Sequence, residues 1–307
     1  MSSRRVEVES PAKVNLHLQV VGKRADGYHE LRTIFQTVDL ADELTIELDD
    51  EPGVRLTVEG AELSAGADNL AHRAAAGFLA RWAPDRGVSI ALRKRIPLGA
   101  GLGGGSSNAA SVLLALQRLL GDPAPPADLW LLARELGADV PYFLVGGTAL
   151  GVGRGDEVIP LTELPEREIW LVLPPVHVST AAAFADLGEL TGKPFDPRIL
   201  ALVQRGELGW EAFAHAANDF EAAVFRRWPE LASLHADLVS TGAAARLSGS
   251  GAAFWLTDLP ESGGHFTESG SARPLGERLH GLRLPEGTRI ERCRTVARAS
   301  LFQSECR

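Results

Sequence analysis

The sequence predicts an α+β protein built as two lobes. Both halves of the chain mix short strands with amphipathic helices, and neither half repeats the other. A chain of 307 residues is long enough for about two domains. We expect the boundary near Pro160–Glu168, which gives an N-terminal domain of residues 1–160 and a C-terminal domain of residues 161–307.

The predicted strands are short segments bounded by Gly, Pro or Asp. They are Val14–Val21, Leu44–Leu48, Val54–Glu59, Val88–Leu92, Thr148–Val152, Ile169–Leu173, Arg246–Leu247, Ala252–Thr257 and Arg289–Arg294. The Gly- and Ser-rich segment Pro260–Pro274 is typical of a surface loop instead.

Helices are predicted where apolar residues recur three and four positions apart. The clearest pattern starts near Ser107 and is ended by Gly121. Asp68 is placed to cap an earlier helix over Leu70–Trp82. The remaining predicted helices are Pro126–Leu136, Ala181–Leu187, Ile199–Arg205, Asp219–Arg227 and Leu231–Val239.

Charge and composition exclude several classes of protein. The formal net charge of −9 argues against a non-specific nucleic-acid binder, and we interpret the basic run Arg93–Arg95 as a solvated strand end. No apolar signal core or membrane-spanning stretch is present. The two cysteines, Cys293 and Cys306, fit neither a disulfide framework nor a metal site. We therefore expect a cytoplasmic protein without nucleic-acid or membrane partners, as a monomer or weak homodimer.

One glycine-rich segment points to a phosphate-binding site. It contains five glycines in seven residues and runs Pro97, Leu98, Gly99, Ala100, Gly101, Leu102, Gly103, Gly104, Gly105, Ser106, Ser107. Glycine lets backbone N–H groups approach a ligand closely. The segment leads into a helix, whose N-terminus attracts anions. A phosphate cradle is therefore the favoured function of residues 97–107.

Three other interpretations of this segment fit less well. Gly99, Gly101 and Gly104 match the dinucleotide fingerprint, but they do not follow a strand directly, and the acid expected further on would be Asp122 in a turn. A P-loop requires a Lys after the glycines, and none follows. A plain packing loop does not explain Ser106 and Ser107 feeding a strong helix.

Two further polar positions are candidates for catalysis. Lys13 and Asn15 share one face of an apolar strand, where Lys13 is either paired or extends its tip to water. Asp139 stands among apolar residues at a helix junction, where it is either a helix cap or a general base. A cationic Lys13 would keep such a carboxylate ionised.

Two more segments stay ambiguous on residue pattern alone. Tyr28 and His29 follow a turn and either stack on a nucleobase or belong to the core. His29–Glu30 does not match a zinc helix, because Thr33 occupies the position of the second histidine. Leu247–Gly251 is either a plain hairpin or a loop that closes over phosphates.

Taken together and in this order, these segments resemble the GHMP family of small-molecule kinases. The family's three motifs are matched by Pro11–Asn15, Pro97–Ser107 and Leu247–Gly251. The similarity runs nearly end to end and leaves mainly Pro260–Pro274 outside it. Within the family, Arg24–His29, Leu136–Pro141 and the run from Gly101 are similar to the branch whose acceptor is linked to cytidine diphosphate. Variation at Leu98 and Ala100 is ordinary for the family.

The resemblance implies a two-lobed GHMP kinase fold with the active site in the cleft between the lobes. It implies ATP as co-substrate, with Mg²⁺, and a small-molecule cytidine-diphosphate substrate in isoprenoid precursor synthesis. It also implies roles for individual residues: Lys13 and Asp139 as the catalytic pair, residues 97–107 as the ATP site, and Asn15, Tyr28, His29, Thr180 and Phe184 as substrate contacts. No metal-ligand cluster of the protein's own is expected.

Other functions remain open at this point. A kinase of the same family could act on mevalonate, homoserine or a sugar, and segment 26–29 is what argues against that. A decarboxylase on the same scaffold has no sequence feature in its favour. A catalytically silent nucleotide-binding regulator would not need both Lys13 and Asp139.

Overall fold

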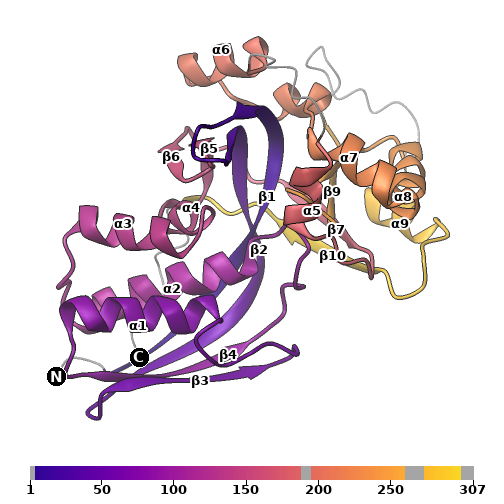
Figure 1. The fold of residues 1–307 in the computed structure, drawn as a ribbon. Helices are drawn as coiled ribbons and strands as arrows, with labels where there is room; N and C mark the ends of the chain where they lie inside the picture. Colours follow the sequence, from indigo (N-terminus) through magenta and orange to yellow (C-terminus); the bar gives the residue numbers. More distant parts are fainter. Residues whose placement is uncertain (1–3, 188–194, 260–272, 299–307) are drawn as a thin grey trace.

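The computed structural model describes residues 4–187, 195–259 and 273–298, and within them the chain forms two lobes, each built on a β-sheet (Figure 1). Residues 260–272 of the predicted Pro260–Pro274 loop, and Cys306, lie outside the described residues. No helix in the described ranges is long and apolar enough to cross a membrane.

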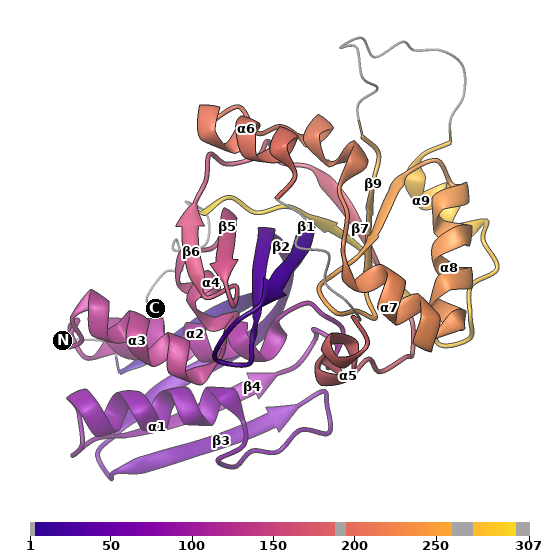
Figure 2. The ribbon, with the colours of Figure 1, turned by 45° about the horizontal axis from the view of Figure 1, so that its top comes forward.

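The first sheet is organised around one long strand. Its strands are β1 (Arg5–Lys23), β2 (His29–Asp49), β3 (Gly53–Glu59), β4 (Gly87–Arg93), β5 (Thr148–Gly153) and β6 (Glu157–Pro160). β1 pairs antiparallel with β2 over almost its whole length, and β4 and β5 each pair with a different stretch of β2. β3 adds to β4 in parallel and β6 adds to β5 in antiparallel orientation. β5 and β6 therefore lie beside the tip of the β1–β2 hairpin (Figure 2).

Helices cover one face of this sheet (Figure 1). They are α1 (Leu70–Trp82), α2 (Gly104–Leu119), α3 (Pro126–Leu136) and α4 (Val140–Val145). Fully buried Phe78, Leu116 and Tyr142 pack from the helices against Ile46 and Ile90 of the sheet. Burial of this apolar face is the main source of stability for such a layer.

The second lobe is an antiparallel sheet in the order β10-β7-β9-β8 with its own helices. Its elements are β7 (Glu168–Leu173), α5 (Thr180–Ala185), α6 (Pro197–Arg205), the 3₁₀ helix η1 (Trp210–His215), α7 (Phe220–Arg227), α8 (Pro229–Ser240), β8 (Ala244–Leu247), β9 (Phe254–Thr257), α9 (Leu275–His280) and β10 (Arg289–Arg294). Phe220, Leu234 and Phe254 are buried in its core.

An apolar cluster joins the two lobes. Val14 and Ile34 of the first sheet belong to the same buried cluster as Leu171 and Trp255 of the second. The Trp255 indole also donates a hydrogen bond to the backbone carbonyl of Asn15 at 2.9 Å. The first sheet ends at Pro160 and the second begins at Glu168. The division into domains 1–160 and 161–307 stays a prediction.

Several predicted boundaries are corrected by the structure. The predicted strands Val14–Val21 and Leu44–Leu48 are only parts of the much longer β1 and β2, whose bulges interrupt the alternation that marks a strand. The α1 helix is capped by Asn69, whose side chain accepts the N–H of Ala71 at 2.9 Å, whereas Asp68 bonds Ser64 instead. Short β6, η1 and α9 were not predicted.

Candidate active site

A cavity of about 570 Å³ opens between the lobes. It is lined from the first lobe by the glycine loop, Lys13 and Asp139, and from the second lobe by Thr180, Phe184 and Ser250. Residues of all three motif segments, which are far apart in the sequence, therefore line one cavity.

The glycine loop supplies one wall of the cavity. Residues 97–106 all line it, but Ser107 does not. The Ser107 side chain is fully buried and accepts a hydrogen bond from the hydroxyl of Ser10 at 2.8 Å. The reason is that α2 begins at Gly104, three residues before the predicted start, so Ser107 lies on the buried face of its first turn. Ser107 therefore packs behind the glycine loop, bonded to Ser10, and does not face the cavity.

The N-terminus of α2 is open toward a ligand. Gly103, at its N-cap, has a left-handed φ of 71°, and no side chain caps the helix. Unpaired N–H groups and the helix dipole are what a phosphate needs. Gly101 has a φ of 76°, and a Cβ atom there would lie 2.0 Å from the carbonyl oxygen of Ser248. The loop conformation therefore depends on glycine at this position.

Lys13 is buried, with 3% of its surface exposed, so its tip does not reach bulk water. Its ammonium donates to Asn15 Oδ1 at 2.6 Å and to the carbonyl of Gly101 at 2.9 Å. Burial lowers the pKa of Lys13, and the nearby Asp139 carboxylate opposes that change. Lys13 thus ties the glycine loop to β1 and holds a cation at the floor of the cavity.

Asp139 occupies the cap position of α4, but its carboxylate makes no capping hydrogen bond. Its Oδ2 lies 3.7 Å from Lys13 Nζ, and about a third of its side chain (36%) is exposed. Of the two roles predicted for Asp139, the helix cap is therefore excluded. The carboxylate faces the cavity, where it can accept a proton.

Lys94 corrects the prediction that Arg93–Arg95 is a solvated strand end. Arg93 and Arg95 are exposed and pair with Glu43, as expected of a strand end, but Lys94 is buried and ion-paired with the fully buried Asp42. Asp42 also accepts the backbone N–H groups of Arg95 and Ile96, at 2.7 and 2.9 Å.

The sequence held a signal for the burial of Lys94. Lys94 continues the inward-facing set Val88, Ile90 and Leu92, two residues apart, and a strand keeps that period. The network reaches α2, because Asn108 donates to Asp42 Oδ2 at 2.9 Å. It anchors the segment that enters the glycine loop.

The predicted substrate contacts come from both lobes, and His29 meets Phe184 near the tip of the β1–β2 hairpin. The rings of His29 and Phe184 are stacked, with centroids 4.9 Å apart, and Thr180 shares a hydrogen bond with Ser250 at 2.9 Å. Tyr28 is 55% exposed, so it is not a core residue. Asn15, Thr180 and Phe184 line the cavity, whereas Tyr28 and His29 stand next to residues that do.

The segment Leu247–Gly251 links β8 and β9 and touches the glycine loop. The Ser248 hydroxyl donates to the carbonyl of Gly101 at 3.0 Å. Asn218 holds the segment from below by donating to the carbonyls of Leu247 and Gly249, at 2.8 and 2.7 Å. Sequence analysis missed Asn218 and Arg154, because no short motif marks them.

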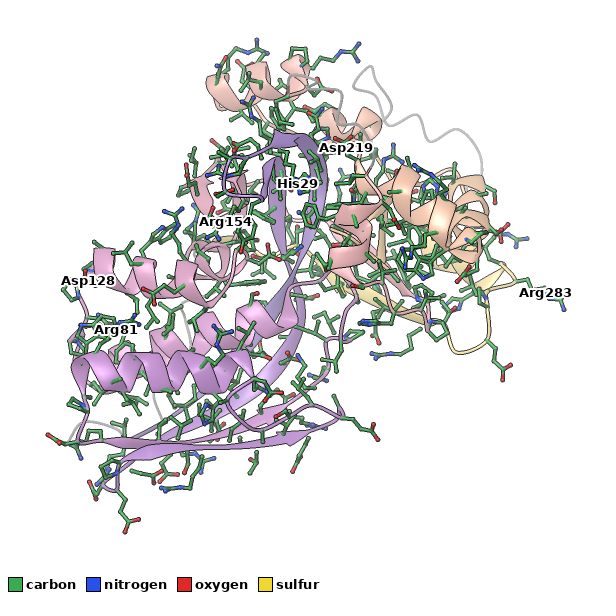
Figure 3. All side chains as sticks on the ribbon, viewed as in Figure 1. His29, Arg81, Asp128, Arg154, Asp219 and Arg283 are labelled. Carbon is green, nitrogen blue, oxygen red and sulfur yellow. The ribbon has the colours of Figure 1, made fainter. Side chains whose placement is uncertain are left out.

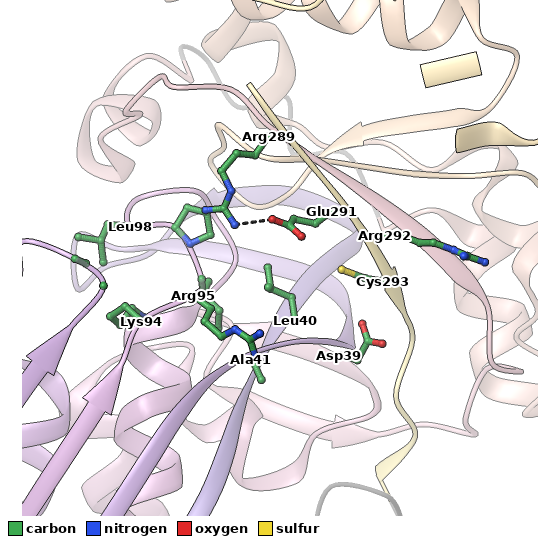
Figure 4. A pocket seen from close by; sticks show the side chains of 14 residues that line it. Asp39, Leu40, Ala41, Lys94, Arg95, Leu98, Arg289, Glu291, Arg292 and Cys293 are labelled. Atoms are coloured by element: carbon green, nitrogen blue, oxygen red, sulfur yellow. Dashed lines mark hydrogen bonds and ion pairs between the residues drawn. The ribbon is translucent and has the colours of Figure 1, made fainter. Parts of the chain in front are cut away.

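A second cavity, of about 630 Å³, lies behind the segment Lys94–Leu98, between β2 and β10 (Figure 4). Arg289 pairs with Glu291 across 2.6 Å at its edge. Burial raises the pKa of the Cys293 thiol there to about 12, so the thiol stays protonated. This cavity shares only Lys94, Pro97 and Leu98 with the site described above.

Known proteins resemble this chain in sequence and in fold. Residues 69–147 match the family described as GHMP kinases N terminal domain. A 4-diphosphocytidyl-2-C-methyl-D-erythritol kinase of Solibacter usitatus (strain Ellin6076) is 45% identical over 262 residues, covering 83% of this chain and 81% of that protein. The chain belongs to the 4-diphosphocytidyl-2-C-methyl-D-erythritol kinase family. A relative of the same name from Geobacter sp. (strain M21) is 41% identical over 81% of this chain and 88% of its own length.

Solved structures confirm the predicted two-lobed GHMP kinase fold. A 4-(cytidine 5′-diphospho)-2C-methyl-D-erythritol kinase superposes with a TM-score of 0.74 at 38% identity, covering 94% of this chain and 98% of the other. A homoserine kinase from Cytophaga hutchinsonii ATCC 33406 superposes with a TM-score of 0.69 at 20% identity, over 97% of this chain and 96% of the other, which shows a shared fold alone. As a member of the 4-diphosphocytidyl-2-C-methyl-D-erythritol kinase family, the chain is a small-molecule kinase.

Proposed function

We propose that this kinase transfers the γ-phosphoryl group of ATP to the 2-hydroxyl of 4-diphosphocytidyl-2-C-methyl-D-erythritol, in the methylerythritol phosphate route to isoprenoid precursors. The observation that carries the proposal is the Lys13–Asp139 pair, 3.7 Å apart, in the cavity that the glycine loop lines. The family relationship supplies the substrate.

The donor half of the site is the glycine loop. ATP phosphates would rest on residues 97–106, against the uncapped N-terminus of α2. The lysine that a P-loop carries is replaced by Lys13, whose ammonium is bonded to the carbonyl of Gly101 in the same loop. Charge that develops on the transferring group is thus met by N–H dipoles and one buried cation.

Asp139 is the proposed general base. Its carboxylate accepts the proton of the acceptor hydroxyl while the hydroxyl oxygen forms a bond to the γ-phosphorus. The bond from that phosphorus to the bridging oxygen breaks, and ADP leaves with the electron pair. Lys13 keeps Asp139 oriented, because its ammonium lies 3.7 Å from Asp139 Oδ2 and is itself fixed by Asn15 and the carbonyl of Gly101.

The acceptor half is formed by the predicted substrate contacts. Phe184 and His29 offer flat surfaces on which a cytosine could stack, and the Thr180 hydroxyl lines the same wall. Asn15 lines the cavity too, where its amide oxygen accepts from Lys13 and its Nδ2 donates one N–H to Thr33 Oγ1 at 2.7 Å. Asn15 therefore fixes Lys13.

Mg²⁺ fits this site as an ion carried by the nucleotide. Among the described residues, no group of three His, Cys, Asp or Glu side chains is arranged to hold a metal. Mg²⁺ in kinases is usually held by phosphates and one or two carboxylates, and Asp139 and the Ser106 hydroxyl are oxygen donors that line the cavity. The ion would supply charge neutralisation on the phosphates.

The test is acceptor-dependent release of ADP by the purified protein. The cytidylyl acceptor, mevalonate, homoserine and galactose are assayed side by side with ATP and Mg²⁺. We expect turnover with the cytidylyl acceptor alone, and ³¹P spectra of the product should show a new phosphomonoester on the erythritol unit. Turnover with one of the other acceptors, or none with the cytidylyl compound, would refute the proposal.

A further inference from the structure

Arg154 lines the cavity, yet no motif and no proposed role covers it. It lies in the turn between β5 and β6, beside the hairpin that carries His29 (Figure 3). Its guanidinium carbon is 4.9 Å from the centroid of the Tyr28 ring, a distance at which a cation is attracted to the face of an aromatic ring. Tyr28 and Arg154 thus form one surface at the rim of the site.

A buried carboxylate holds Arg154 in this position. Asp156 is 1% exposed, and its Oδ2 accepts from Nε and Nη2 of Arg154 at 3.2 and 2.8 Å. The same oxygen accepts from Nε of Arg134 at 2.9 Å. One carboxylate is therefore shared by two guanidinium groups, so Arg154 keeps positive character toward the cavity. Using the Nε–Nη2 edge on Asp156 leaves the other edge of the guanidinium for an anion.

The turn and the hairpin tip are braced to one another. Glu30 accepts the backbone N–H of Gly153 at 3.2 Å and also bonds Arg24 at 2.6 Å. Arg154 is therefore fixed relative to Tyr28 by contacts on both sides. A cation that is held in place before the ligand binds loses little conformational freedom on binding.

The other cations of the cavity are already committed. Three Lys or Arg side chains line it in the part of the chain that the structure describes: Lys13, Lys94 and Arg154. Lys13 is bound to Asn15 and Gly101 beside Asp139, and Lys94 is buried against Asp42. Arg154 differs because 27% of its side chain is exposed.

We propose that Arg154 binds the diphosphate of the acceptor, with Asp156 as its positioning residue; this inference rests on the proposed function. A nucleoside diphosphate brings at least two negative charges to a protein whose net charge is −9. A pre-placed guanidinium, which binds phosphate oxygens in pairs, offsets that repulsion. Arg154 then selects acceptors that carry a diphosphate.

The test measures binding of cytidine, CMP and CDP by calorimetry, with the donor site saturated by a non-hydrolysable ATP analogue. For wild type we expect affinity to rise along that series. Arg154→Gln should weaken CDP by about 10- to 100-fold and cytidine by less than about threefold. Arg154→Lys, which keeps the charge but loses the fork, should fall between. Equal weakening of cytidine and CDP, or no weakening of CDP, overturns the proposal.

Arg134→Gln is the matched control, because Arg134 binds the same oxygen of Asp156 but does not line the cavity. It should change CDP affinity by less than about threefold. Asp156→Asn should weaken CDP, and should add little in an Arg154→Gln background, since both changes act on one contact. Additive losses would contradict the positioning role.

Turnover assays distinguish a failure of the proposed function from a failure of the role of Arg154. If wild type does not phosphorylate the cytidylyl acceptor, the proposed function fails whatever the variants do. If wild type does, Arg154→Gln should raise the acceptor KM and leave the ATP KM unchanged. An unchanged acceptor KM in an Arg154→Gln protein that melts like wild type refutes the role of Arg154 alone.

Discussion

Lys13 Nζ lies 3.7 Å from Asp139 Oδ2, and the two side chains differ sharply in exposure, at 4% and 36%. The cation is built into the wall between β1 and the glycine loop, whereas the carboxylate stands at the start of α4 with no capping bond. A fixed, buried cation orients the accessible carboxylate beside it, and the carboxylate can still reach a substrate proton.

Asp139→Asn should lower kcat by about 10²- to 10⁴-fold, because the amide cannot accept the proton of the acceptor hydroxyl. Binding of ATP should change little, since the proposed nucleotide site is residues 97–106 rather than this side chain. Steady-state kinetics and calorimetry with an ATP analogue measure the two quantities. Turnover close to that of wild type would remove Asp139 from the mechanism.

The alkaline limb of the kcat/KM profile should lie below pH 10.5, the ordinary pKa of a lysine, because burial lowers the pKa of Lys13. Activity should fall as the ammonium loses its proton. Lys13→Arg, which does not deprotonate in this range, should remove the limb. It should also be slower at every pH, because the larger guanidinium has little room beside Gly103. A limb at or above 10.5 in wild type would contradict the assignment.

Gly101→Ala should destabilise the protein by about 2 kcal/mol or more, because it puts a Cβ on a left-handed residue and 2.0 Å from a backbone oxygen. Chemical denaturation measures the change. Gly105→Ala is the control, since its Cβ would meet nothing closer than 3.6 Å inside α2. That variant should match wild type or gain up to about 1 kcal/mol. Equal losses in both variants would contradict the geometry.

The buried pair Asp42–Lys94 should be costly to break, and removing both charges should recover only part of that cost, because Asp42 also accepts the backbone N–H groups of Arg95 and Ile96. Asp42→Ala leaves a buried ammonium unpaired and should cost about 3–5 kcal/mol. The double variant Asp42→Leu with Lys94→Met removes both charges and should be clearly more stable than the single variant. Equilibrium unfolding in urea tests both. A double variant that is no more stable than Asp42→Ala would show that the charge is not what matters.

The free energy of unfolding should fall as the pH drops below about 6.5, where an exposed histidine takes up a proton. His17 is buried, and its Nδ1 accepts the N–H of Ala217 at 3.1 Å. Burial lowers the pKa of His17 more than the carboxylates of Asp196 and Asp219 raise it. The unfolded chain therefore binds a proton that the folded chain refuses, and stability is lost as the pH falls toward the folded pKa.

Urea unfolding at a series of pH values measures this loss. His17→Asn keeps an acceptor near the position of Nδ1 but cannot titrate, so its stability should depend less steeply on pH between 6.5 and the acid range. The same slope in both proteins would show that other groups dominate the pH dependence.

The sequence by itself determined the elements that depend on local pattern. Helix α3 at Pro126–Leu136 and strand β10 at Arg289–Arg294 have the predicted bounds, because apolar periodicity and flanking Pro or Gly act within a few residues. The glycine loop was recognisable for the same reason, because the conformations open to its backbone depend on the glycines within the loop itself.

Only the tertiary structure decided which polar residues meet. Lys13, Asp139 and Ser250 come from β1, α4 and the β8–β9 turn, and their approach depends on how the lobes pack around Val14 and Trp255. Local pattern likewise could not tell that Ser107 bonds Ser10, or that Lys94, which the strand period marks as inward-facing, pairs with Asp42, because each partner is distant in the chain. Short-range pattern determines the helices, the strands and the glycine loop, whereas the pairing of polar side chains depends on the packed fold.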